Sequence, residues 1–568
     1  MTDNIQKNYY NLVLKMAPRL LTLLDREEFS ATYGCFDRSF WHYKFITDYP
    51  CARYQEAVLV LALLYTQQFP GNVYFRNERV LNWAKAALLY WTRIQNKDGS
   101  FNEAYPNEHS FVTTAFTLYA VSESFLILSD YMEEEETARV LKSIEKAALW
   151  LINNEDPWVA NHTAGAVTAL YNTHLITGDN KYKKGAVKKL NYVLNMQSKE
   201  GWFYEYGSAD PGYLSLTIDF LAKYYDKSND EKVKEHLKEA CGFLGYFLHS
   251  DGSFGGDYGS RNTEFFYPHG LEIFKSECDH ANRILHKFYP ALEVERIANP
   301  NYMDDRYFAF EASNFLQSAL SYKKASEVQD EKMSLERDYF IEFPEAGIIT
   351  VQNKKYQAVL NYKKGGVLKV FSRKNGHNMG ELVFSDAGFL AELQEKKNRK
   401  AISQFYFNKF NLSKENSKIA FHSSMINWRD TRPLKNLIVP FRLFNYILGP
   451  SFTIMKHFNN IMKKILFKGK KYLPVMINKE IEFKDEEITV RDLIYTKLKF
   501  MKIKKVDHIV PYHTSATKYF LNSSLSSGSY RFPNLAEQIN KKSHAELFYK
   551  LDFRASVPQV SGGAVDGN

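Results

Sequence analysis

One short pattern recurs in the first half of the chain and limits what this half can fold into. A polar residue, a glycine and an aromatic residue two positions later stand together at 97–101 (KDGSF), 199–203 (KEGWF) and 250–254 (SDGSF). The intervals are about 102 and about 51 residues, with the missing midpoint near 153–158. The segments between these turns carry apolar residues at three- and four-residue intervals. A period near fifty with one turn per unit predicts stacked helix hairpins.

The glycine in each turn gives these hairpins a common geometry. Glycine admits positive φ where a helix ends, and the aromatic residue can fold back onto the hairpin. Hairpins arranged around an axis form an (α/α) toroid whose turns line one mouth. We therefore predict a toroid over residues 1–335, with the polar residues that follow each turn facing a common cleft.

The pattern changes near residue 340 to the alternation of a β-sheet. Segments such as IITVQNKKYQAVLNY and KEIEFKDEEITVRD carry β-branched and aromatic residues at period two. A chain of 568 residues is also too long for one growing core. We predict an α+β multidomain protein in which an antiparallel β-sandwich over 336–555 follows the toroid. The small, polar residues 556–568 are predicted to be a disordered tail.

The net charge of +9 is concentrated in one segment. Between Asp430 and Glu480 there is no acidic residue, and without the ten basic residues found there 64 basic residues face 65 acidic ones. These ten are Arg432, Lys435, Arg442, Lys456, Lys463, Lys464, Lys468, Lys470, Lys471 and Lys479. Apolar residues at helical spacing make 431–479 a basic amphipathic insertion. It either packs on one of the two domains or lies on an anionic membrane surface.

The remaining composition favours a reduced, cytoplasmic protein, peripheral at the inner membrane face if the insertion binds lipid. The N-terminus does not read as a secretory signal, and the four cysteines show no paired spacing. No metal-ligand spacing and no glycine-rich phosphate loop stand out, so no metal or cofactor is expected. The basic segment has no recognisable nucleic-acid module behind it, and nucleic acid is not an expected partner.

Polar side chains gather at or just after the predicted turns, on the side that would form the mouth. We expect them to converge on one cleft. The candidates are Asn161, His162, Tyr206, Asp210, Tyr213, Arg261, Asn262, Glu264 and His269.

Two of these residues carry a resemblance to a known family. Asn161 introduces an alanine-rich helix (VANHTAGAVTAL), and Tyr213 follows about fifty residues later, after a turn. With GlyHis at 376–377 and AspAlaGly at 386–388, the chain resembles the heparinase II/III-like polysaccharide lyases, which join a helical toroid to a β-sandwich. The resemblance implies that Asn161 neutralises a uronate carboxylate, that Tyr213 is base, acid or both, and that His377 closes the site. The family continues its strand with a second His and an Asp, whereas Asn378 follows His377 here.

The implied reaction is β-elimination on an acidic polysaccharide or a lipid-linked oligosaccharide, in bacterial surface-polysaccharide metabolism. Removing the proton α to a carboxylate requires that the carboxylate be neutralised and a base be placed nearby. Asn161 and His162 would hydrogen-bond the carboxylate and Arg261 would add a bidentate cation. Tyr213 would take the proton if Arg261 or a histidine lowers its pKa. Substrate contacts are assigned to Tyr206, Asp210, Arg261, Asn262, Glu264 and His269.

Other functions remain open at this stage. The same scaffold could serve a non-catalytic glycan-binding or assembly protein. It could also host a glycoside hydrolase with Glu264 and Glu272 as paired acids. Asn161 could instead cap the helix that begins there, and Tyr213 could be a structural aromatic residue.

Overall fold

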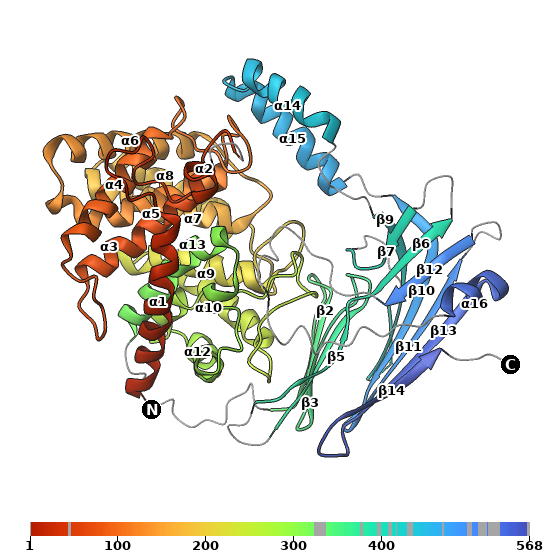
Figure 1. The fold of residues 1–568 in the computed structure, drawn as a ribbon. Helices are drawn as coiled ribbons and strands as arrows, with labels where there is room; N and C mark the ends of the chain where they lie inside the picture. The colour runs from red at the N-terminus through yellow and green to blue at the C-terminus, as the bar shows by residue number, and fades with distance from the viewer. Residues whose placement is uncertain are drawn as a thin grey trace.

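The computed structural model describes most of the chain. The described residues are 2–43, 47–322, 337–374, 379–394, 399–406, 412–415, 417–428, 435–468, 471–496, 502–508, 520 and 534–564. Helices occupy the first part, and antiparallel sheets with a helical insertion occupy the rest (Figure 1). This is the predicted order of a toroid followed by a β-sandwich.

The helices of the first part form an inner and an outer ring. The inner helices are α3 (Val58–Thr66), α5 (Phe111–Leu128), α7 (Ala160–Thr177), α9 (Pro211–Ser228), α11 (His269–Phe274) and α13 (Asp305–Ser321). The outer helices are α1 (Thr2–Leu23), α4 (Glu78–Arg93), α6 (Glu134–Asn153), α8 (Asn180–Leu194), α10 (Glu231–Leu244) and α12 (Asp279–Glu293). The short α2 (Arg38–Trp41) and the 3-10 turn η1 (Ala52–Ala57) lie between α1 and α3.

Burial explains which helices are inner. Almost every residue of α7 and α9 is buried, whereas α6 and α10 bury one stripe each, as amphipathic outer helices do. α5 belongs to the inner class as well. The segment Phe111–Tyr131 is long and apolar enough to cross a membrane, but 78% of its most apolar window is buried inside the protein, as for a core helix.

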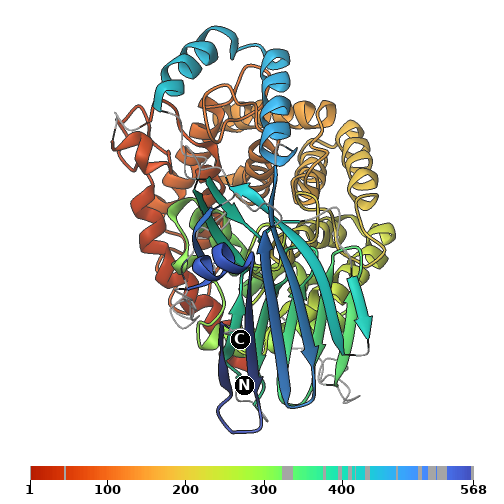
Figure 2. The same ribbon diagram turned by 90° about the vertical axis from the view of Figure 1, so that its right-hand side faces the viewer.

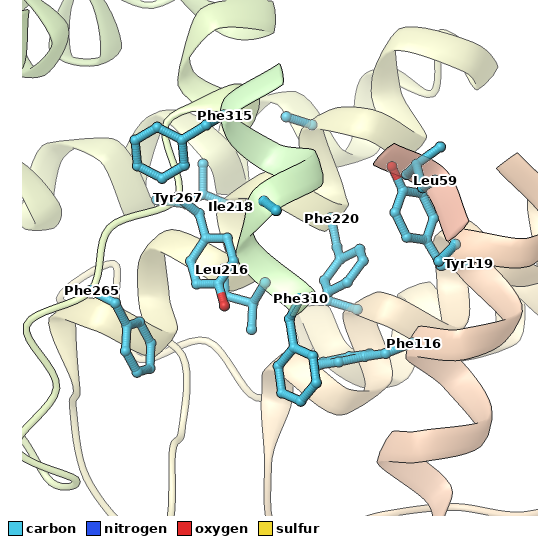
Figure 3. Packing of buried hydrophobic residues seen from close by; sticks show 14 of the residues in the cluster. Leu59, Phe116, Tyr119, Leu216, Ile218, Phe220, Phe265, Tyr267, Phe310 and Phe315 are labelled. Carbon is cyan, nitrogen blue, oxygen red and sulfur yellow. The ribbon is translucent and has the colours of Figure 1, made fainter. Parts of the chain in front are cut away.

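The ring is closed by the first and last helices of the toroid. Successive inner helices contact each other from α3 to α13, and α13 in turn contacts η1 and α3. Each inner helix also packs on an outer one, and the partner of α13 is α1 from the N-terminus. Figure 3 shows that aromatic side chains, among them Phe116, Phe220 and Phe310, fill the centre of the ring. The toroid therefore has a packed centre.

The three predicted turns share one conformation. Gly99, Gly201 and Gly252 have φ of +99°, +96° and +86°. A Cβ at Gly99 would lie 2.4 Å from the carbonyl oxygen of Lys146, and one at Gly201 would lie 2.4 Å from that of Glu239. All three turns need glycine for positive φ, and Gly99 and Gly201 are in addition pressed against the backbone of the next outer helix.

A glutamine side chain fastens each of these contacts. Gln95 donates to the carbonyl oxygen of Gly99 (3.1 Å) and to that of Ser143 in α6 (2.9 Å). Gln197 donates to the carbonyl oxygens of Gly201 (2.8 Å) and of His236 in α10 (2.9 Å). An earlier turn repeats the arrangement, with Gln55 bonded to Gly34 and to Ala87 of α4. We call this arrangement the Gly–Gln clamp.

The β domain consists of two antiparallel sheets. The first has the order β1-β2-β3-β4-β5, and the second β12-β6-β7-β9-β10-β11-β13-β14, with β8 paired to β9. The first sheet contains β1 (Tyr339–Phe343), β2 (Ile348–Gln352), β3 (Tyr356–Asn361), β4 (Val367–Ser372) and β5 (Leu382–Asp386). The second contains β6 (Phe389–Gln394), β7 (Arg399–Ile402), β8 (Leu412–Glu415), β9 (Lys418–Trp428), β10 (Tyr472–Phe483), β11 (Glu487–Thr496), β12 (Lys502–His508), β13 (His544–Asp552) and β14 (Gln559–Ala564). Helix α16 (Leu535–Lys542) packs on β12 and β13.

The two sheets bury a common apolar core that also contains a charged cluster. Lys479 of β10, fully buried, is ion-paired with Asp386 and Asp492, and His508 Nε2 lies 2.8 Å from Asp386 Oδ1. The charge of Lys479 lowers the pKa of the Asp386 carboxyl far below its usual range despite burial. Lys479, counted with the basic insertion, is therefore part of the sandwich core.

Two segments of the β domain, the basic insertion and the C-terminal tail, add to or differ from what the sequence predicts. The insertion forms a hairpin of α14 (Lys435–Leu448) and α15 (Phe452–Lys468) between β9 and β10. The tail predicted for 556–568 is not wholly irregular, because Gln559–Ala564 form β14 and pair with β13. Backbone hydrogen bonding to an edge strand orders this segment despite its small side chains.

The Gly–Gln clamp predicts a large cost for a side chain at its glycine. Gly201→Ala should lower the melting temperature more than Gly178→Ala. Both glycines have positive φ, which costs alanine roughly 1–2 kcal/mol, but a Cβ at Gly178 would meet nothing within 4 Å. Thermal unfolding of the two variants measures the difference. Equal losses would show that the contact with α10 adds no constraint.

Candidate active site

The predicted polar residues lie mainly at the end of the toroid where the inner helices begin, called here the N-terminal mouth. Asn161 and His162 are in the first turn of α7, and Tyr213 is in the first turn of α9. The ring centroids of Tyr206 and Tyr213 are 6.0 Å apart, and those of Tyr206 and His162 are 6.4 Å apart. The Arg261 guanidinium carbon lies 4.3 Å from the Tyr206 ring centroid. These five residues therefore form one group.

Asp210 holds two elements of this group together. It caps α9 by accepting a hydrogen bond from the Tyr213 amide (3.2 Å), and its other oxygen accepts one from the Arg261 amide (2.7 Å). The Thr263 hydroxyl also donates to it. Asp210 is buried with both oxygens engaged, so it positions Tyr213 and Arg261. Its predicted role as a substrate contact is not supported by this geometry.

Asn161 is fully buried and bonded to a residue that sequence reasoning missed. Its side-chain amide donates to Glu205 Oε2 (2.7 Å), and its backbone amide donates to Glu205 Oε1 (2.9 Å). Burial raises the pKa of Glu205 well above its usual range, and the nearby Asp210 raises it further. Burial therefore favours the protonated form of Glu205, although the hydrogen bonds from Asn161 act in the opposite direction. Asn161 does not cap α7, since the cap residue is Val159.

His162 is oriented by a second missed residue, Asp156. The imidazole Nδ1 lies 2.9 Å from Asp156 Oδ2. Asp156 lies in the turn at 153–158, which lacks the glycine of the other turns. A carboxylate on Nδ1 fixes the tautomer that presents Nε2 as the acceptor nitrogen of a neutral ring. This geometry suits a proton acceptor.

Tyr213 remains a neutral phenol in this environment. Burial raises its pKa well above the ordinary value, and neighbouring Tyr307 and Tyr206 raise it further. Arg261 lowers the pKa, as predicted, but burial outweighs this effect. The hydroxyl is hydrogen-bonded to Tyr307 at the start of α13, a residue that no sequence motif singled out.

The floor of the N-terminal mouth is closed by packed side chains. The Arg53 guanidinium carbon lies 3.8 Å from the Phe310 ring centroid and 4.8 Å from that of Phe116. Arg53 is also ion-paired with Glu56, and a cavity of only about 30 Å³ lies beside them. Figure 3 shows Phe310 and Phe116 side by side with Tyr267 and Phe220 nearby. A polymer could bind across this end of the toroid but could not pass through it.

Two predicted substrate contacts belong to the boundary between the domains. The Lys364 ammonium donates to Asn262 Oδ1, and Lys369 lies 2.9 Å from Glu264. Both lysines are buried residues of the β domain. Asn262 and Glu264 therefore join loop 255–268 to the first sheet, at the edge of the group formed by Tyr206 and Arg261.

His269 lies away from the other candidates. Its Nε2 is 3.0 Å from the Ser321 hydroxyl at the end of α13, and its Nδ1 is 3.7 Å from Asp219 in the middle of α9. The reason is that the chain after loop 255–268 lies beside the middle of α9, where Gly270 packs against the backbone of Asp219. His269 lines a cavity of about 580 Å³ formed by the C-terminal halves of inner helices. His377 is outside the described residues.

The paired acids of the hydrolase alternative are also apart. Glu264 faces Lys369, whereas Glu272 in α11 accepts hydrogen bonds from Tyr9 (3.0 Å) and Lys275 (2.8 Å). Glu264 is thus paired with Lys369 and Glu272 with Lys275, so the two carboxylates do not share one site.

Comparison with known proteins agrees with this architecture. The family model for the ulvan lyase N-terminal domain matches residues 50–272. Among curated protein sequences, none matches the chain. The chondroitin AC lyase of Streptomyces coelicolor A3, solved with chondroitin sulphate, is similar with a TM-score of 0.55 and 8% identity, over 89% of this chain and 68% of that one.

Two further solved structures show weaker likeness. A heparan sulfate lyase mutant from Pedobacter heparinus has a TM-score of 0.37 and 11% identity, over 78% of this chain and 62% of that one. An unsaturated glucuronyl hydrolase from Streptococcus agalactiae has a TM-score of 0.38 and 10% identity, over 57% of this chain and 92% of that one. Residues 50–272 thus match the ulvan lyase N-terminal domain family, and the chain shares its fold, a helical toroid joined to a β domain, with the chondroitin AC lyase.

Proposed function

We propose that this chain is a polysaccharide lyase that cleaves an acidic, uronate-containing glycan by β-elimination. The observation that carries the proposal is the group at the N-terminal mouth, where a carboxylate-oriented histidine, a neutral tyrosine and an arginine lie within contact of Tyr206. Proton abstraction α to a carboxylate needs a base, an acid and a cation in one place.

Arg261 is the residue best suited to neutralise the substrate carboxylate. Arg261 is a partly exposed residue whose guanidinium carbon lies 4.3 Å from the Tyr206 ring centroid, and its planar fork matches a carboxylate. The family resemblance assigns this role to Asn161, but Asn161 is fully buried. We assign Asn161 and Glu205 a positioning role beside His162.

His162 is assigned the role of base and Tyr213 that of acid. Nε2 of His162 takes the proton from the carbon α to the carboxylate, and the electron pair forms the double bond to the β carbon. The bond from the β carbon to the glycosidic oxygen breaks, and the Tyr213 phenol donates its proton to that oxygen. The high pKa of Tyr213 keeps this proton in place before the reaction. Solvent then returns the two side chains to their starting states.

The substrate and setting extend this proposal. The proposed chemistry of the site favours an acidic polysaccharide as the substrate. A more specific alternative is a lipid-linked oligosaccharide of bacterial surface-polysaccharide metabolism.

Incubation with a panel of uronate polymers tests the reaction class, because the elimination product absorbs in the ultraviolet. Release of reducing ends without this absorbance would instead indicate a hydrolase. Binding without either product would indicate a glycan-binding protein.

Substitution of the acid and the base tests the two roles. His162→Gln and Tyr213→Phe should each lower turnover by about a hundredfold or more, the scale of a lost proton-transfer group, with little change in melting temperature. Tyr204→Phe is the matched control, since Tyr204 is 44% exposed beside the group and should retain activity. Normal turnover by both site variants, or a larger loss in Glu264→Gln, would refute the assignment.

The raised pKa of Glu205 has a consequence for stability. A carboxyl whose pKa is raised by folding stabilises the protein below its unfolded pKa of about 4.3, and this contribution is lost as the pH rises toward the folded pKa. Glu205→Gln cannot titrate, so its melting temperature relative to the wild type should increase as the pH is raised from about 5 to about 8. Glu293→Gln, exposed on α12, controls for the loss of one charge. A difference that does not vary with pH would contradict the assignment.

A further inference from the structure

The outward face of α14 is unusually apolar for a protein surface. Val439, Leu443, Tyr446 and Ile447 are 74%, 60%, 83% and 63% exposed. Their spacing of i, i+4, i+7 and i+8 puts them in one stripe on the helix. Ile454, Ile461 and Met462 of the neighbouring α15 are also exposed. Contiguous apolar surface of this kind marks an interaction site.

Contacts on the opposite face hold the hairpin without using this stripe. Asn445 donates to the Pro106 carbonyl oxygen (2.6 Å), and Asn459 donates to that of Glu108 (3.0 Å). The Phe452 ring lies 5.7 Å from that of Trp150 in α6. Within the hairpin, Phe458 packs on Phe441 and Phe444. The hairpin is therefore anchored on the toroid loop before α5, with its aliphatic side chains turned outward.

The figures agree with this description. Figures 1 and 2 show α14 and α15 at the periphery of the molecule, beyond the end of the sheet that carries β9 and β10. The anchoring loop precedes the start of α5, so the hairpin borders the N-terminal mouth. Whatever binds the stripe would lie beside the candidate active site.

Charge identifies the kind of partner. The segment between Asp430 and Glu480 contains no acidic residue, and nine basic residues remain there when Lys479, which is buried in the sandwich core, is left out. A second copy of this face would bring like charges together, which opposes self-association. An anionic bilayer offers both negative headgroups for the basic residues and an apolar layer for the stripe. The apolar run Leu437–Leu448 is about 18 Å long as a helix, too short to cross a hydrocarbon core of about 30 Å.

We propose that the α14–α15 hairpin is a membrane-binding arm that lies on an anionic bilayer surface. The stripe of Val439, Leu443, Tyr446 and Ile447 enters the boundary between headgroups and acyl chains. Exposed basic residues of the segment, such as Lys456 and Lys471, contact the anionic headgroups around it. This inference is independent of the lyase reaction, since it depends on the hairpin alone.

Vesicle co-sedimentation of the full chain tests the arm. The wild type should bind vesicles of phosphatidylcholine with about one third phosphatidylglycerol, bind neutral phosphatidylcholine vesicles at least tenfold less, and lose binding in high salt. The fourfold variant with serine at Val439, Leu443, Tyr446 and Ile447 should bind the anionic vesicles at least tenfold less. The melting temperature of this variant should not fall, because the four side chains are exposed and contribute little to the packing of the protein.

A matched control separates the stripe from general surface hydrophobicity. Phe29→Ser with Val73→Ser removes two apolar residues that are 93% and 76% exposed on the toroid, and this variant should bind as the wild type does. Absence of binding to anionic vesicles at low salt would overturn the proposal, as would full binding by the fourfold variant. A wild-type dimer that the fourfold substitution dissociates would identify a second copy as the occupant instead.

Discussion

The Gly–Gln clamp is the contact on which the rest of the toroid depends. Each clamp presses the turn of one hairpin onto the backbone of the next outer helix, and the glutamine bonds to both. A hairpin alone cannot bury its apolar faces, so the spacing between neighbours must be fixed by a contact that repeats. Backbone contact fixes it more tightly than side-chain packing, because no rotamer can relax it. The loops that follow the turns are thereby held at one end of the ring.

Burial then sets the pKa values of the titratable side chains at the N-terminal mouth. The same desolvation raises the pKa of both Tyr213 and Glu205, although one is a phenol and the other a carboxyl. Asp210 is held by donors from α9 and from loop 255–268, so the groups around it are ordered before any substrate arrives. Preorganised donors of this kind are worth more in a dry site than in water. The group therefore works as a unit, with Asp210, Asp156 and Glu205 supporting His162, Tyr213 and Arg261.

The sequence predicted the parts of this arrangement that depend on local pattern. Glycine turns and helical periodicity gave the hairpins, and alternation gave the sandwich. The grouping of Asn161, His162, Tyr206, Tyr213 and Arg261 followed from their place after the turns. Glu205 and Tyr307 were missed because their importance comes from contacts across the ring. The prediction for His269 was wrong because the path of loop 255–268, which brings His269 beside the middle of α9, produces no periodic pattern in the sequence. Segment 559–564 pairs with β13 through its backbone, which its composition does not reveal.

The closure of the ring by α1 and α13 has a consequence for synthesis. α1 is made long before its inner partner, which ends at Ser321, so the two helices meet only after some three hundred further residues have been added. Bringing such distant segments together costs loop-closure entropy before any contact offsets it. Until then the apolar stripe of α1 and the open edge of α3 are exposed on the nascent chain. Chaperones that bind apolar helices would therefore find a long-lived target in α1.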